Sequence, residues 1–398
     1  MTSRRRARRV AVMAVLLGAS VLLGGCWHMI PLEKRGLVSL LAIDAAPAGR
    51  YQVTVAVIQP PGLPPPGPSG QGGGAGGTPV FLRSASSRSV AAAVQMLTES
   101  TYLHLDFTHL EAVLVSESVA RSGLAPALDY IADSPELSQT AWLLVVRRGT
   151  AHALLETTEK DLPRPNEVLS QTVEWTRIHT PYQAERVMTA FKEMPLAGMA
   201  FTTAGTSAGT SQSGAQTVPF VVAPEALFRG DRLVGWLQGP AALGWAVAMQ
   251  HIHHQLLTES IPLGRFDLEM VGARRQIRVA PDGSHPPRVA LTLRVNAHLA
   301  DMVGSGDFWQ SPQRLQTMEA AAAQLLAADV EDGLRTAQAA GADIFGLGEH
   351  VRLQDPAYWD LARADWSAHA FPALPVDVHV RVTVSSVGEI LCPLIGRC

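Results

Sequence analysis

The stretch "VDVHVRVTVSSVG" at residues 376–388 decides the fold class of the C-terminal part of this chain. Valine occupies every second position at first, a pattern typical of a β-strand with one buried face. Asp377, His379 and Arg381 would share the opposite face, where water can solvate them. Upstream, residues 311–340 carry apolar side chains at helical spacing among many alanines, which predicts a long amphipathic helix. Such a strand beside such a helix indicates an α+β domain in which the helix lies on a β-sheet.

Strand and helix patterns also alternate through the rest of the chain. The predicted strands are 37–44, 51–59, 110–116, 141–149, 266–270, 276–279 and 288–297. The predicted helices are 87–99, 117–133, 150–156 and 240–250. "ALFRGDRLVGWL" at residues 226–237 predicts a β-hairpin that turns at Arg229, Gly230 and Asp231. We therefore expect a mixed α+β and α/β protein of two to three domains, with helices packed on mixed sheets.

Two low-complexity segments suggest where the chain divides. "PPGLPPPGPSGQGGGAGGT" at residues 60–78 lacks the side chains of a core and predicts a surface insertion. "TTAGTSAGTSQSGAQT" at residues 202–217 has the composition of an interdomain linker. The expected division is a signal segment (1–25), an N-terminal α/β domain (26–201), the linker (202–217), a hairpin–helix subdomain (218–262) and a C-terminal α+β domain (263–398).

The first residues have the order of a secretory signal. Five arginines precede an apolar run, Val10 to Leu23, which is shorter than the roughly 20 residues that span a bilayer. Leu23, Gly24 and Gly25 then lead into Cys26, an arrangement that suits cleavage between Gly25 and Cys26 and lipid attachment to the new N-terminal thiol. Diacylation would anchor the mature chain stably. The alternative is an ordinary signal peptide with a cysteine nearby by chance.

Composition restricts the classes of partner. Without the first 25 residues, which carry five arginines and no acid, the formal net charge changes from −3 to −8. A mildly acidic chain without a basic stripe in its sequence is a poor candidate for nucleic acid binding. No long uncharged apolar stretch follows Cys26, so we expect no transmembrane helix in the mature chain. Cys392 and Cys398 could form a disulfide or remain two free thiols.

The sequence contains candidate metal ligands and catalytic residues, but none of these groups forms a complete metal or catalytic site. "HIHH" at residues 251–254 offers two histidines at helical spacing, but no further ligand lies nearby in the sequence, so the end of a polar helix is the alternative. His104, Asp106 and His109 resemble a catalytic cluster, yet alternation along a strand would place His109 on the other face. Neither a GxSxG elbow nor a phosphate loop is present. We predict no catalytic residue, metal ligand or cofactor, and a protein that is not an enzyme.

The segment "GADIFGLGEH" at residues 341–350 has two interpretations. Gly346 and Gly348 allow tight turns, and Phe345 could fill an apolar gap, which would make a corner packed on the core. Alternatively, Asp343, Phe345 and the two glycines form a loop that is presented to a partner.

Several blocks together resemble one family. They are "LLGGCW" (22–27), "HLEAVLVSESVARSGLAPALDYIADSPEL" (109–137), "ALFRGDRLVGWLQGPAALGW" (226–245) and "GADIFGLGEHV" (341–351). In this order they resemble the Ger(x)C spore germination lipoproteins, the C-subunits of nutrient germinant receptors. The resemblance covers most of the chain from Cys26 to Gly388.

The resemblance implies a lipid-anchored protein on the outer face of the spore's inner membrane, with Cys26 as the acylated, for example palmitoylated, residue. It also implies two integral-membrane partners, the A-type and B-type receptor subunits, and a non-enzymatic role in the germination response to nutrients. Two other functions are alternatives to this one. A substrate-binding lipoprotein of a transporter would need two similar lobes around a cleft, and a secreted hydrolase would need a nucleophile arrangement.

Overall fold

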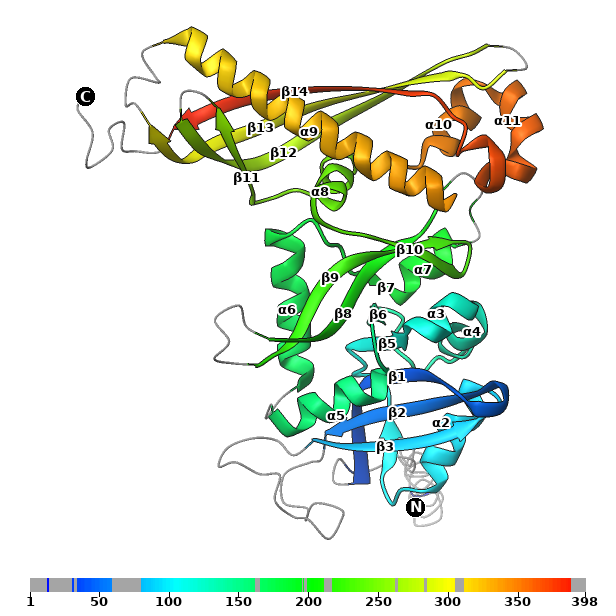
Figure 1. Ribbon diagram of the computed structural model, residues 1–398. Helices are drawn as coiled ribbons and strands as arrows, with labels where there is room; N and C mark the ends of the chain where they lie inside the picture. Colours follow the sequence, from blue (N-terminus) through cyan, green and yellow to red (C-terminus); the bar gives the residue numbers. More distant parts are fainter. Residues whose placement is uncertain are drawn as a thin grey trace, which may run out of the picture.

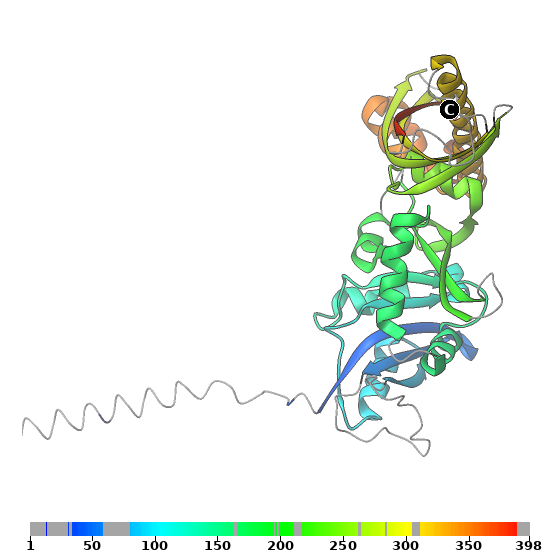
Figure 2. The same cartoon turned by 90° about the vertical axis from the view of Figure 1, so that its left-hand side faces the viewer.

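The computed structural model describes residues 13, 31, 34–58, 80–161, 165–194, 196, 199–210, 217–261, 264–282, 285–304 and 311–387. The molecule is elongated, with a ten-stranded sheet in one part and a four-stranded sheet at the other end (Figure 1). Figure 2, turned by 90°, shows the same division along the long axis. The expected mixed fold with more than one domain is confirmed.

The ten-stranded sheet has the order β10-β9-β8-β6-β5-β1-β2-β3, with β4 paired to β1 and β7 paired to β6. Its strands are β1 (Arg35–Ala46), β2 (Arg50–Ile58), β3 (Val80–Ser87), β4 (His104–Asp106), β5 (Ala112–Ser116), β6 (Trp142–Val146), β7 (Glu185–Arg186), β8 (Thr202–Thr210), β9 (Thr217–Arg229) and β10 (Arg232–Leu237). The central strands β1, β5, β6 and β8 are mutually parallel, and the outer pairs are antiparallel.

Helices cover both faces of this sheet, which explains the apolar run in β1. Val38 and Ile43 belong to a core shared with α2 (Val90–Glu99), α3 (Glu117–Ser122), α4 (Ala125–Asp133) and α7 (Val187–Glu193). Leu40 and Ala42 face the opposite core, which contains residues of α5 (Ala151–Asp161) and α6 (Pro165–His179). A strand buried on both faces loses the alternation of polar and apolar residues, as parallel central strands do.

The four-stranded sheet has the order β11-β12-β13-β14. Its strands are β11 (Gln255–Ile261), β12 (Gly264–Ala280), β13 (Arg288–Gly304) and β14 (Val376–Val387). The chain crosses from β13 to the parallel strand β14 through α9 (Pro312–Ala340), which lies on the inner face of the sheet. The expected long helix and alternating strand are therefore confirmed, together with their packing.

Shorter helices complete this core. They are α8 (Gly239–Ala248), α10 (Leu347–Gln354) and α11 (Pro356–Ala362). The backbones of α8 and α9 approach very closely, because a Cβ on Gly244 would lie 2.2 Å from the carbonyl carbon of Asp329. Only glycine allows this approach. In the part of the chain described here, no helix is both long and apolar enough to cross a bilayer.

Two expectations about the chain's organisation differ from the structure. Residues 202–210, predicted as linker, form β8 between β6 and β9. β8 needs small side chains because its neighbours lie very close. The Thr203 hydroxyl donates to the Leu143 carbonyl at 2.6 Å, and a Cβ on Gly205 would lie 2.6 Å from the Trp236 ring. The strands predicted at 266–270 and 276–279 are also one strand, β12, with irregular register near Gly272.

Candidate functional site

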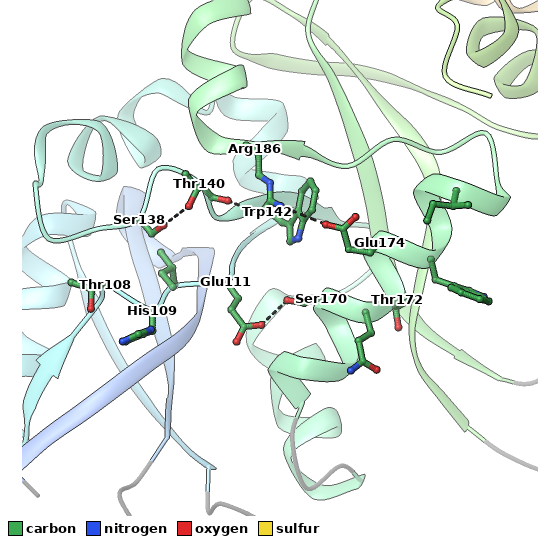
Figure 3. Close-up of a pocket in the computed structure, with 14 residues that line it drawn as sticks. Thr108, His109, Glu111, Ser138, Thr140, Trp142, Ser170, Thr172, Glu174 and Arg186 are labelled. Carbon is green, nitrogen blue, oxygen red and sulfur yellow. Dashed lines mark hydrogen bonds and ion pairs between the residues drawn. The ribbon is translucent and has the colours of Figure 1, made fainter. Parts of the chain in front are cut away.

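A groove of about 890 Å³ lies beside α6, where the segments that lead into β5 and β6 meet this helix (Figure 3). Its lining residues come from four segments: Thr108, His109, Leu110, Glu111, Ser138, Thr140, Trp142, Ser170, Gln171, Thr172, Glu174, Trp175, Ile178 and Arg186. The groove forms because β5 and β6 begin at the same edge of the sheet, and α6 packs across that edge.

A tryptophan held by arginines forms one part of the groove. The Arg186 guanidinium carbon lies 3.1 Å from the centroid of the Trp142 ring, and that of Arg177 lies 5.1 Å from it. Arg186 also donates to the Thr140 carbonyl at 2.6 Å and lies 3.6 Å from a Glu174 oxygen. Burial lowers the pKa of Arg186, while the charge of Glu174 raises it. The stacked cations hold the ring in a fixed orientation.

A carboxylate is fixed on the other side of the groove. Glu111 accepts one hydrogen bond from the Asn166 amide at 2.7 Å and one from the Ser170 hydroxyl at 2.6 Å. Figure 3 shows the second of these contacts crossing from the β5 side to α6. Because both carboxylate oxygens accept from α6, Glu111 ties the helix to the sheet edge. The groove is therefore preorganised, because Glu111 on one side and Arg186 on the other already have partners.

The rim of the groove exposes apolar side chains of α6. Trp175 is 68% exposed and Ile178 is 37% exposed. The Trp175 ring packs against the His179 ring at a tilt of 34°, with centroids 4.2 Å apart. An exposed tryptophan beside a preorganised groove is typical of a surface that binds another molecule. We call this surface, formed by Trp175, Ile178 and the groove, the α6 groove.

The suspected histidine clusters do not come together as sites. His251 packs edge-on to Trp245, with centroids 5.4 Å apart, and burial lowers its pKa to about 4. His254 instead lies 2.6 Å from a Glu269 oxygen. Among the residues that the structure describes, no group of three His, Cys, Asp or Glu side chains is arranged to hold a metal ion.

The cluster in residues 104–109 has a structural role. Asp106 accepts from Arg35 at 3.0 Å and from the Thr108 hydroxyl at 2.6 Å, contacts that fix β4 beside β1. Burial alone would raise the pKa of Asp106, but these hydrogen bonds lower it below its ordinary value. His109 lines the α6 groove, whereas His104 is exposed on β4.

The segment 341–350 is buried. Gly341 ends α9 with φ of 62°, as a left-handed cap requires, and Phe345 is fully buried. Asp343 accepts from the backbone N–H groups of Leu347 and Gly348 and from the Trp366 indole at 3.1 Å. Burial raises the pKa of Asp343 to about 6, although these donors act in the opposite direction. The geometry favours a packed corner over a loop presented to a partner.

The predicted cleavage and lipidation site at Gly25 and Cys26 lies outside the described residues, as do Cys392, Cys398 and the insertion at 60–78. Sequence reasoning missed the α6 groove. Its only local signal was the pattern in "EWTRIH", where Trp175 and Ile178 fall on one side of the helix and Arg177 and Glu174 carry charge.

Comparisons with known proteins all point to the same family of proteins. Residues 28–199 match the family described as spore germination protein N-terminal domain, and residues 225–388 match spore germination B3/GerAC like, C-terminal. Spore germination protein KC of Bacillus subtilis (strain 168) is 21% identical over 402 residues, covering 96% of each chain. A putative spore germination protein of the same organism, YfkR, is 31% identical over 138 residues, which cover 34% of this chain and 35% of YfkR.

A solved structure supports the fold. The crystal structure of the GerBC protein aligns with a TM-score of 0.56 at 16% identity, covering 86% of this chain and 96% of that one. The names of these relatives describe germination proteins and not enzymes.

Proposed function

The chain belongs to the GerAC-like family of spore germination proteins, and from this membership we propose that it is a non-enzymatic, membrane-anchored subunit of a nutrient germinant receptor. Its partners would be the A-type and B-type integral-membrane subunits. Its place would be the outer face of the spore's inner membrane.

The anchor in this proposal is a lipid on Cys26, after cleavage behind Gly25. The support is the order of basic, apolar and small residues before this cysteine. Residues 27–34 would then connect the anchor to β1, which starts at Arg35. Eight residues reach at most about 29 Å, so the β1 end of the molecule would stay close to the bilayer.

The observation that carries a binding role is the exposure of Trp175 beside a groove in which Glu111, Glu174 and Arg186 already have partners. Glu111 is held by two donors of α6, and Arg186 is held by Thr140 and Trp142. Because Glu111 and Arg186 already have hydrogen-bond partners, they are poorly placed to transfer protons to or from a substrate. They instead keep the surface around Trp175 rigid, as an interface with an aromatic anchor requires. We infer that the α6 groove contacts a receptor subunit.

The test compares Trp175→Ala with Tyr102→Ala, a control at an aromatic residue that is 64% exposed elsewhere. Tagged chains are recovered from spore membranes, and the co-purified A-type and B-type subunits are quantified beside nutrient-induced germination. Trp175→Ala should weaken the contact about thirtyfold and reduce both readouts clearly, since an interface tryptophan contributes about 2 kcal/mol or more. Equal recovery with both variants would contradict the proposal, and tight binding of a small solute by the isolated chain would favour a transporter lipoprotein instead.

A further inference from the structure

Three arginines stand side by side on the outer face of the four-stranded sheet. Arg274 of β12 is directly opposite Arg294 of β13, and Arg294 is directly opposite Arg381 of β14. All three side chains are exposed. The neighbours of Arg294 along its strand, Leu293 and Val295, are buried on the inner face, so the arginines point away from α9. We call these three residues the arginine row.

The protein does not neutralise this row within the part of the chain that the structure describes. The flanking rows are uncharged or weakly basic: Gln276, Thr292 and His379 on one side, and Gly272, Asn296 and Thr383 on the other. The nearest carboxylates on this face have other partners. Asp377 binds Arg288 at 3.1 Å, and Glu269 lies 2.6 Å from His254. None of the three arginines has an ion pair with a described residue.

Three adjacent arginines without counter-charges among the described residues lower the stability of the sheet when no partner is bound. Side chains directly opposite each other on neighbouring strands are about 5 Å apart, and like charges at that distance destabilise the pair. Arg294 experiences this repulsion from both sides. An anion that bridges the three guanidinium groups would reverse the sign of this interaction.

We propose that the arginine row is the docking site for an acidic helix of a protein partner. Neighbouring strands are about 4.8 Å apart, so the outer two arginines are separated by about 9.6 Å across the strands. Carboxylates at positions i, i+4 and i+7 of a helix lie on one face at rises of about 6 and 10.5 Å. An extended strand would place its same-face side chains at about 6.7 and 13.4 Å, which fits the row less well.

The position of the row disfavours a lipid surface as the occupant. From β1 to β10 there are five steps between strands, or about 24 Å, and the four-stranded sheet lies beyond β10 (Figure 1). If Cys26 anchors the chain, β1 is at the membrane end and the arginine row is at the far end. The choice of a protein over a lipid as the occupant rests on the proposed anchor at Cys26. The charge complementarity between the arginine row and an acidic helix does not depend on that anchor.

The test measures binding of two fluorescent, alanine-rich helical peptides to the mature chain, residues 26–398, expressed without lipid. One peptide carries glutamates at i, i+4 and i+7, and the other carries three glutamates at i, i+2 and i+5, which do not share one face of the helix. Vesicles with and without phosphatidylglycerol form a third arm. The variants are Arg294→Gln and the matched control Arg88→Gln, at an exposed arginine between β3 and α2.

The first peptide should bind more tightly than the second, with affinity that falls as salt rises. Arg294→Gln should weaken this binding about tenfold or more and should raise the melting temperature of the free chain, while Arg88→Gln should change neither. Equal binding of the two peptides, or unchanged binding with Arg294→Gln, would overturn the proposal. Row-dependent binding to anionic vesicles without peptide discrimination would overturn the protein occupant. No receptor is present in this assay, so its outcome does not depend on the proposed receptor function.

Discussion

Phe345→Ala tests whether the segment 341–350 is a packed corner. The Phe345 ring is fully buried in the core shared by α8, α9 and the four-stranded sheet. It lies against α9, with its Cζ 3.5 Å from the position of a Cβ on Gly333. Its carbonyl also accepts from Arg275 at 3.1 Å, so the backbone has little freedom to close a cavity.

Removal of a buried phenylalanine ring costs about 3–5 kcal/mol when the surroundings do not relax. For a folding unit of this size, each kcal/mol lowers the melting temperature by about 2–4 °C, so the expected decrease is about 10 °C. Trp245, Trp359 and Trp366 lie in the same core, so their fluorescence reports its unfolding.

Two matched variants make the result interpretable. Phe345→Leu keeps most of the apolar volume and should cost clearly less than Phe345→Ala. Leu353→Ala, at a side chain that is 61% exposed, should stay within about 0.5 kcal/mol of wild type. An unchanged melting temperature with Phe345→Ala would refute the packing argument. It would favour the alternative, in which residues 341–350 form a loop that contacts a partner.

Three further variants probe close packing and buried acids. Gly244→Ala should cost about 3 kcal/mol in urea unfolding, because its Cβ would lie 2.2 Å from the backbone of Asp329; a neutral effect would mean that α8 and α9 separate freely. Asp343 has a folded pKa raised to about 6, so its stabilising contribution is complete below about pH 4 and is lost as pH rises through 6. Asp343→Asn should therefore remove about 3 kcal/mol of pH dependence, and an identical pH profile would contradict this. Burial raises the pKa of Glu225 well above its ordinary value, so Glu225→Gln should increase the urea midpoint more at pH 8 than at pH 5; equal shifts would show that the carboxyl is already ionised in the fold.

The sequence predicted the elements whose periodicity is set by one buried face. The alternation at 376–387 and the apolar stripe at 311–340 are confirmed as β14 and α9. β8 was missed because alanine, serine and glycine interrupt its threonines, so the segment shows no apolar alternation. There the sheet context decides, since close contact with Trp236 and Leu143 selects small residues.

The α6 groove could not be predicted in the same way. Its residues come from segments that are distant in sequence, and α6 itself was not predicted. The pairing of Arg186 with Trp142 depends on which strands become neighbours. The arginine row also depends on the register of three strands, although Arg381 was correctly expected on the polar face of β14. Pairing between strands is a tertiary property that a single strand's pattern does not contain.

We propose above that this chain is a lipid-anchored subunit of a germinant receptor. Mass spectrometry of the N-terminal peptide of the protein purified from spore membranes tests it most directly. We predict a chain that begins at Cys26 and carries acyl groups, and a Cys26→Ala variant that leaves the membrane fraction and impairs germination. An unmodified N-terminus on a chain that still purifies with the membrane would contradict the claim.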